Sequence, residues 1–144
     1  MKKIVLGEKD NNVNYDFRET CFGIVKKGNE FYLTSKKGEI SLIGGGVEPG
    51  ESHLETLKRE FIEEAGLTIT ECNEFVTIDC YWLTKNQKNM ESLANFYIVE
   101  VSDTVVLATE EGSKLVKVSE KELRDSLALP YQKKAIELYL ELDK

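Results

Sequence analysis

Hydrophobic residues that alternate with polar ones, or form short runs, predict β-strands over much of the chain. The clearest case is FVTIDCYWL at 75–83, where apolar side chains recur at every second position. That period of two places the apolar side chains on one face of a strand. Shorter apolar-rich runs predict further strands at 20–25, 31–34, 94–102 and 114–118.

The segment 52–65 instead predicts a helix. It starts with SHLE, which has the spacing of a capping box, and Gly66 follows as a residue suited to the left-handed position after a helix. One stripe of this helix is apolar and is expected to face the core. The stripe comprises Leu54, Leu57, Phe61 and Ala65.

Two shorter signals predict helices near the C-terminus. SEKE at 119–122 is a second capping box, and Pro130 begins an apolar-rich run. Strands, a central helix, more strands and then helices predict an α/β (α+β) fold with a mixed β-sheet and helices on its faces. With 144 residues and no internal repeat or linker, we expect a single domain over 1–144.

Composition narrows the class of protein. Apolar residues make up 41% and charged residues 31%, as in soluble folded domains. The net charge of -7 argues against a stable nucleic-acid partner. The three cysteines show no metal-binding spacing, and the N-terminus lacks the apolar stretch of a signal peptide. We therefore expect a cytoplasmic protein with no membrane attachment.

The predicted helix carries an unusual group of carboxylates, Glu60, Glu63 and Glu64, beside its apolar stripe. Each like-charged pair at i,i+3 or i,i+4 costs roughly 0.2–0.5 kcal/mol on an exposed helix. All three also lie near the helix C-terminus, where the macrodipole disfavours anions. A solvated acidic face is one interpretation. The other is a site for a hard divalent cation such as Mg²⁺, which takes oxygen ligands.

A glycine cluster precedes this helix. Gly44, Gly45 and Gly46, followed by the Pro49-Gly50 turn, predict a loop whose backbone approaches other groups closely. Exposed N–H groups in such a loop suit phosphate oxygens, although a tight strand-to-helix connection is the simpler alternative. No Gly-Lys-Ser/Thr follows, so the loop is not a P-loop.

Together these residues resemble a complete Nudix box that runs from Gly45 to Leu67. The motif defines about nine positions in 23, and all of them are filled: Gly45, Glu51, Arg59, Glu60, Phe61, Glu63, Glu64, Gly66 and Leu67. The chain therefore resembles a Nudix hydrolase. The resemblance implies an α/β/α sandwich and hydrolysis of the diphosphate of a nucleoside diphosphate derivative, with Mg²⁺ or Mn²⁺ as cofactor.

The resemblance also implies roles for residues of the box. The metal ligands and catalytic carboxylates would be Glu60, Glu63 and Glu64. Arg59 would orient these carboxylates by ion pairing, and Gly45 would supply a backbone carbonyl or a close contact at the metal. Glu51 would brace the loop through Arg59.

Many relatives add an acidic residue from outside the box. Glu110 and Glu111 are the candidates here, as metal ligand or general base, and we expect Glu111 at the metal and Glu110 near the substrate. A solvated acidic loop is the alternative for both. Arg18, as a phosphate contact, and Tyr81, as a stacking partner for a base, are further substrate-binding candidates.

The sequence leaves two alternatives to an enzyme. A catalytically silent domain of the same fold would bind or sense a nucleotide without cleaving it, and a structural domain would merely carry an acidic helix. The intact set of box carboxylates favours a pyrophosphatase acting on a nucleotide-derived small molecule. The family is often dimeric, so a homodimer is compatible with the resemblance.

Overall fold

The computed structural model describes residues 1–142, so the last two residues of the predicted 1–144 domain lie outside the described part. Within that range the chain forms strands β1 (Lys2–Leu6), β2 (Asp16–Ile24), β3 (Lys26–Lys27), β4 (Glu30–Lys36), β5 (Glu39–Ser41), β6 (Ile43–Gly46), β7 (Ile69–Leu83), β8 (Asn89–Val101) and β9 (Ser113–Ser119). The helices are α1 (His53–Ala65), α2 (Glu120–Ser126) and α3 (Pro130–Glu141).

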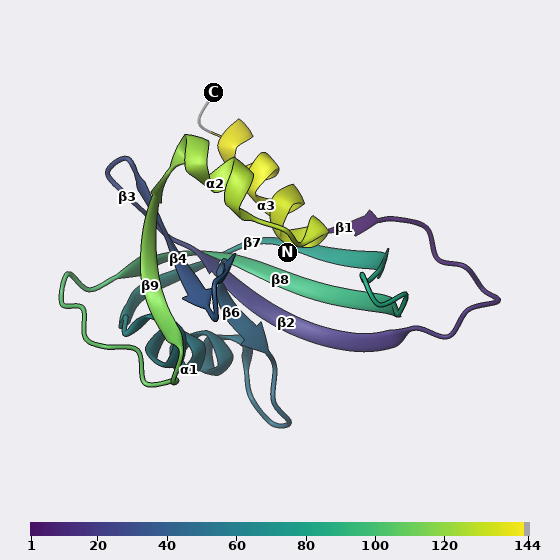
Figure 1. Ribbon diagram of the computed structural model, residues 1–144, viewed down its shortest axis with the longest axis horizontal. Coiled ribbons are helices and arrows are strands. Elements are labelled where there is room, and N and C mark those ends of the chain that lie inside the picture. Colours follow the sequence, from purple (N-terminus) through teal and green to yellow (C-terminus); the bar gives the residue numbers. More distant parts are fainter. Residues whose placement is uncertain (143–144) are drawn as a thin grey trace.

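The strands form a mixed five-stranded sheet and a smaller sheet beside it. The larger sheet has the order β1-β7-β8-β2-β6, with β1–β7 and β2–β8 parallel and the other pairs antiparallel. In the smaller sheet β4 pairs with β3, β5 and β9. In Figure 1, α1 lies below the strands, and α2 and α3 lie above them. The predicted α/β (α+β) sandwich with a mixed sheet is confirmed.

Strand β2 contributes to the apolar core on both faces of the larger sheet. Phe22 packs in the cluster beneath α3, whereas Cys21 packs with Leu57 and Phe61 of α1. Gly23 lets α1 approach closely, because a Cβ at this position would lie 2.5 Å from the Phe61 ring. This close packing places α1 directly beside β2 and β6.

The buried face of α1 is rotated relative to the prediction. Leu54 was expected in the core but is 42% exposed, while Glu64, at 7%, is buried. Leu57 is buried, and the residue above it on the same face of the helix is His53, four residues earlier, rather than Leu54. His53 therefore faces the sheet. Its ring contacts the Tyr97 hydroxyl at 2.6 Å, so the more polar edge of the helix is turned inward.

The observed strands differ from the prediction in several places. The run at 2–6 is too short to show a period, yet it forms β1 at the sheet edge beside β7. Strand β7 begins at Ile69 rather than 75, because register shifts at 69–71 and 74–76 interrupt its alternation. Glycines 44–46 belong to β6, paired with β2, and not to a loop; residues without side chains carry no periodic signal.

None of the helices within residues 1–142 combines the length and the hydropathy needed to cross a membrane.

Candidate active site

Strand β6 brings the backbone of its glycines against the carboxylates of α1. The Gly44 N–H donates a hydrogen bond to Oε1 of Glu64 at 3.0 Å. A Cβ at Gly45 would lie 2.8 Å from the carboxyl carbon of Glu60, which is closer than real Cβ atoms come. Glycine at these two positions therefore permits direct contact between helix carboxylates and strand backbone.

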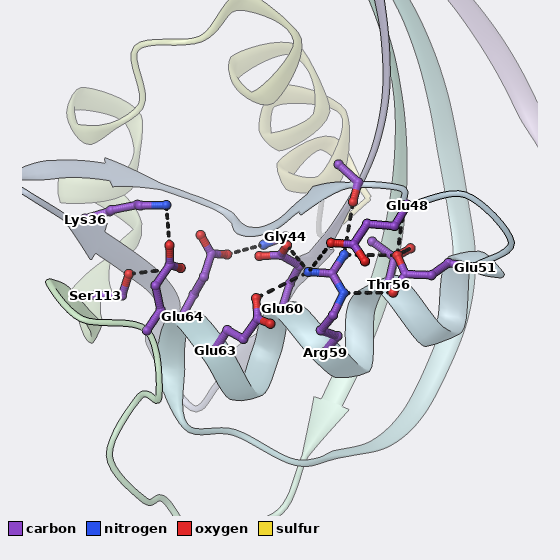
Figure 2. A network of polar contacts seen from close by, with 12 residues as sticks. Lys36, Gly44, Glu48, Glu51, Thr56, Arg59, Glu60, Glu63, Glu64 and Ser113 are labelled. Atoms are coloured by element: carbon purple, nitrogen blue, oxygen red, sulfur yellow. Dashed lines mark hydrogen bonds and ion pairs between the residues drawn. The ribbon is translucent and has the colours of Figure 1, made fainter.

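Arg59 organises the other side of this group, as Figure 2 shows. Its Nε and Nη2 donate to the two oxygens of Glu51 at 2.8 and 3.0 Å. Its Nη1 lies 2.6 Å from Glu60 and 3.3 Å from Glu63, and Nη2 donates to the Gly46 carbonyl at 3.1 Å. The Arg59 hydrogen bonds are the main cause that lowers the pKa of Glu51 to about 2. One guanidinium thus ties the segment before α1 to the glutamates on α1.

The electrostatic environment of Glu64 is unfavourable to its charged form. Burial, helped by the charges of Glu60 and Glu110, raises the pKa of this carboxyl to about 8, although the hydrogen bond from Gly44 opposes the shift. Burial also raises the pKa of Glu60, although Arg59 opposes that shift. Both shifts show that the carboxylates between α1 and β6 carry more negative charge than their surroundings stabilise.

We expect the metal-free protein to become less stable as the pH rises from 5 to 9. The native state keeps the Glu64 proton between the ordinary pKa of 4.5 and about 8, whereas the unfolded chain releases it. The stabilisation is complete below 4.5 and is lost as the pH rises through 8, by roughly 1–4 kcal/mol. Thermal unfolding in EDTA across this range measures it, and Glu64→Gln should flatten the profile. Parallel profiles for the two proteins would contradict the assignment.

The loop between β8 and β9 brings Glu110 to the box. The Glu110 N–H donates to the Glu63 carbonyl at 2.9 Å, at the C-terminal turn of α1. The negative charge of its carboxylate is one of the causes that raise the pKa of Glu60 and Glu64. Glu111, by contrast, is exposed to solvent. The geometry thus favours Glu110 over Glu111 as the acidic residue from outside the box.

The two other predicted substrate-binding residues lie in different places. Arg18 reaches the box: a Cβ at Gly46 would lie 3.1 Å from its Nη2. Tyr81 does not, because β8 and β2 separate its strand from β6. Three strand spacings correspond to roughly 14 Å. The Tyr81 hydroxyl instead donates to Glu91, and its ring contacts Tyr15 edge-on.

Lys36 is a site residue that the sequence pattern did not reveal. It ends β4 opposite Ser113 of β9, and its Nζ lies 2.6 Å from Oε1 of Glu110. That hydrogen bond is the main cause that raises the pKa of Lys36, and the charges of Glu64 and Glu60 add to it. Its relation to the box depends on the pairing of β4 with β9, which no local pattern in the sequence signals.

The donor set fits a hard divalent cation by chemical type. Carboxylate and carbonyl oxygens are the ligands that Mg²⁺ and similar ions take. Yet within residues 1–142 no three acidic, histidine or cysteine side chains already converge as one ligand set. The carboxylates are paired with cations of the protein instead: Arg59 binds Glu60 and Glu63, and Lys36 binds Glu110. The raised pKa of buried Glu64 shows that its charged form is unfavourable here, and a bound cation would stabilise that charged form.

Solved structures of other proteins have the same fold as this chain. A NUDIX hydrolase from Nitrosomonas europaea superposes with a TM-score of 0.68 at 17% identity, over 88% of this chain and 90% of that one. The MutT protein from Bacillus halodurans gives 0.67 at 22% identity, over 83% and 80%. An ADP compounds hydrolase gives 0.64 at 18% identity, over 87% and 72%. These identities show a shared fold alone.

No curated protein matches the chain. The sequence profile described as the NUDIX domain matches residues 18–139, which is most of the chain. The match covers most of β2, the glycines of β6, the whole of α1 and the loop that carries Glu110. On this evidence the chain belongs to the NUDIX family.

Proposed function

We propose that this protein hydrolyses the diphosphate linkage of a nucleoside diphosphate derivative with the help of Mg²⁺ or Mn²⁺. The observation that carries the proposal is the contact of Glu60 and Glu64 with the glycine backbone of β6, at a helix whose last turn also holds the loop that carries Glu110. Two cations, Lys36 and Arg59, border the same group. A carboxylate cluster bordered by cations suits a metal together with the phosphates of a substrate.

We assign a separate role to each residue of the box and to Glu110. The metal ligands would be Glu60, Glu63, Glu64 and Glu110, with the carbonyl of Gly45 beside them. The cation, when bound, neutralises the diphosphate and activates a water for attack at phosphorus. Arg59 keeps Glu60 and Glu63 oriented, since it binds both carboxylates and the Gly46 carbonyl together. The bonds between Arg59 and Glu51 hold the preceding segment in place.

Lys36 and Arg18 are the two cations that would contact substrate phosphates. The Lys36 side chain is 48% exposed and lies at the Glu110 side of the site. Arg18 lies beside Gly46, at the opposite end of β6 from Ile43. A chain of phosphates laid along the β6 backbone would therefore meet positive charge from both β4 and β2.

The test is hydrolysis of a panel of nucleoside diphosphate derivatives, with products separated by chromatography. The panel includes ADP-linked compounds, because one structural neighbour is named an ADP compounds hydrolase, together with dinucleoside polyphosphates, nucleotide sugars and oxidised deoxynucleoside triphosphates. Cleavage that requires Mg²⁺ or Mn²⁺ supports the proposal. Tight metal-dependent binding without cleavage of any member would contradict it and favour a silent nucleotide-binding domain.

Glu110→Gln is expected to lower kcat/KM by about ten- to a hundredfold, whereas Glu111→Gln changes it less than about twofold. Glu110 contacts α1 and influences Glu60 and Glu64, while its neighbour is exposed. Both substitutions remove one negative charge from the same loop, so each controls for the other. Steady-state kinetics on the best substrate measure the difference. An equal loss in both variants, or a larger loss for Glu111→Gln, would remove the role assigned to Glu110.

A further inference from the structure

The ion pair between Lys36 and Glu110 stands at the edge of the carboxylate cluster. The Nζ of Lys36 lies 2.6 Å from Oε1 of Glu110, and the hydroxyl of Ser113 donates to Oε2 at 3.4 Å. Both oxygens of Glu110 are therefore occupied by the protein itself. The side chains are 48% and 33% exposed, so a ligand in solution has access to both partners.

The backbone on each side of this pair is held in place. The loop that carries Glu110 donates from Val106 to Gly66, from Thr109 to Ile62 and from Glu110 to Glu63, all on carbonyls at the end of α1. Lys36 belongs to β4, which pairs with β9 along its whole length. A change of partner by Glu110 or Lys36 would therefore occur by rotation of the side chain, which is fast, rather than by movement of the backbone.

Each member of the pair has a second partner available when the site is filled. The Glu110 N–H donates to the Glu63 carbonyl, so the Glu110 side chain starts beside the turn of α1 that carries the residues proposed to hold a divalent cation. The Lys36 ammonium, a compact charge on a flexible stem, suits a phosphate oxygen. In the state described here, each group instead satisfies the other.

We propose that Lys36 is a latch on Glu110: its ammonium holds the carboxylate away from the metal site until a substrate phosphate takes the ammonium. Glu110 is then free to join Glu60 and Glu64. Metal and diphosphate would strengthen each other's binding through this pair, and linkage requires the two effects to be equal. The inference rests on the proposed function and adds an order of binding to it: the metal reaches its full affinity only when the diphosphate is also bound.

The latch predicts a change in metal binding by the free protein, without turnover. Mn²⁺ affinity, measured by electron paramagnetic resonance, should be about three- to fivefold tighter in Lys36→Met than in wild type. Methylenediphosphonate, a non-hydrolysable diphosphate, should tighten Mn²⁺ binding by wild type and have much less effect on Lys36→Met. The complex that methylenediphosphonate forms with Mn²⁺ without protein is measured separately and subtracted from the signal. Lys114→Met, which removes the same charge from β9 opposite Ser35, should behave as wild type.

The same substitution made in a Glu110→Gln protein distinguishes the latch from simple repulsion between the Lys36 ammonium and Mn²⁺. In Glu110→Gln, the Lys36→Met substitution should no longer tighten Mn²⁺ binding, because the carboxylate that it would release is absent. A gain that persists in this background overturns the latch, and so does equal Mn²⁺ affinity in wild type and Lys36→Met. Lys36→Arg, which keeps the charge, should stay near wild type. If Lys36→Met unfolds, Lys36→Gln is compared in the same way.

Failure of the latch and failure of the proposed function give different results. Without the latch, wild type still cleaves a member of the substrate panel, and only the difference in Mn²⁺ affinity disappears. If the protein is not a hydrolase, no member of the panel is cleaved by wild type, whatever Lys36→Met does to Mn²⁺ affinity.

Discussion

Glu64→Gln is expected to lower kcat for diphosphate hydrolysis by at least about a thousandfold while the protein remains folded. The side chain is 7% exposed and accepts a hydrogen bond from the Gly44 N–H. Glutamine has the same shape, and its carbonyl oxygen can still accept that bond. It cannot supply the negative charge that a divalent cation requires, so metal binding and turnover should fail together.

Glu55→Gln is the matched control for this experiment. Glu55 lies on the same helix, and its carboxylate accepts from the backbone of Ser52 in the capping box, a role that glutamine also fills. Its kcat should stay within about twofold of wild type. Kinetics at saturating Mg²⁺ and thermal unfolding in EDTA are measured for both variants. A Glu64→Gln enzyme with wild-type kcat would exclude this carboxylate from the chemistry, and an unfolded one would make its role structural.

Arg59→Met should impair both stability and activity. The guanidinium is 24% exposed and binds Glu60, itself 13% exposed, as well as the Gly46 carbonyl. Its removal leaves a largely buried carboxylate and a carbonyl without their partner, at a cost of about 1–3 kcal/mol in the free energy of unfolding. We expect kcat/KM to fall by about a hundredfold or more, because Glu60 and Glu63 lose the group that orients them. Arg59→Lys should recover only part, because an ammonium lacks the planar fork.

Urea denaturation and steady-state kinetics of the same preparations measure these two effects. Lys58→Met removes a positive charge from the preceding, exposed position of α1 and should change stability by less than about 0.5 kcal/mol. If Arg59→Met is as stable and active as wild type, the contacts of Arg59 do not organise the site. If Lys58→Met has the same effect as Arg59→Met, the net charge of the helix matters rather than the hydrogen bonds.

Local interactions explain why the helix of the box and the spacing of its carboxylates could be predicted. The capping box at Ser52 and the left-handed Gly66 delimit α1 as the sequence predicts. Within a helix, residues three and four apart share a face, so Glu60, Glu63 and Glu64 must lie together whatever surrounds them. The prediction was less accurate about which face is buried. Leu54 is exposed and Glu64 is buried, because packing against the sheet determines which face of the helix is covered.

The choice of residues from outside the box depended on long-range pairing. Glu110 rather than Glu111 is the proposed ligand because the backbone N–H of Glu110 donates to a carbonyl at the end of α1. Lys36 lies beside Glu110 because β4 pairs with β9 in the register that sets Lys36 opposite Ser113. Tyr81 lies far from the glutamates because its strand is three positions from β6 in the sheet. None of these relations leaves a periodic signal in the chain.

By itself, the sequence determined the helix with its caps, the spacing of the box and most of the strands. These features follow from backbone propensity and side-chain period, which act between near neighbours. The tertiary structure decided that Gly44–Gly46 form a strand, that β1 joins the sheet edge, and that Lys36 holds Glu110. Those features arise from strand order and register, where the contacting groups come from distant parts of the chain, and they settle only when the whole sheet assembles.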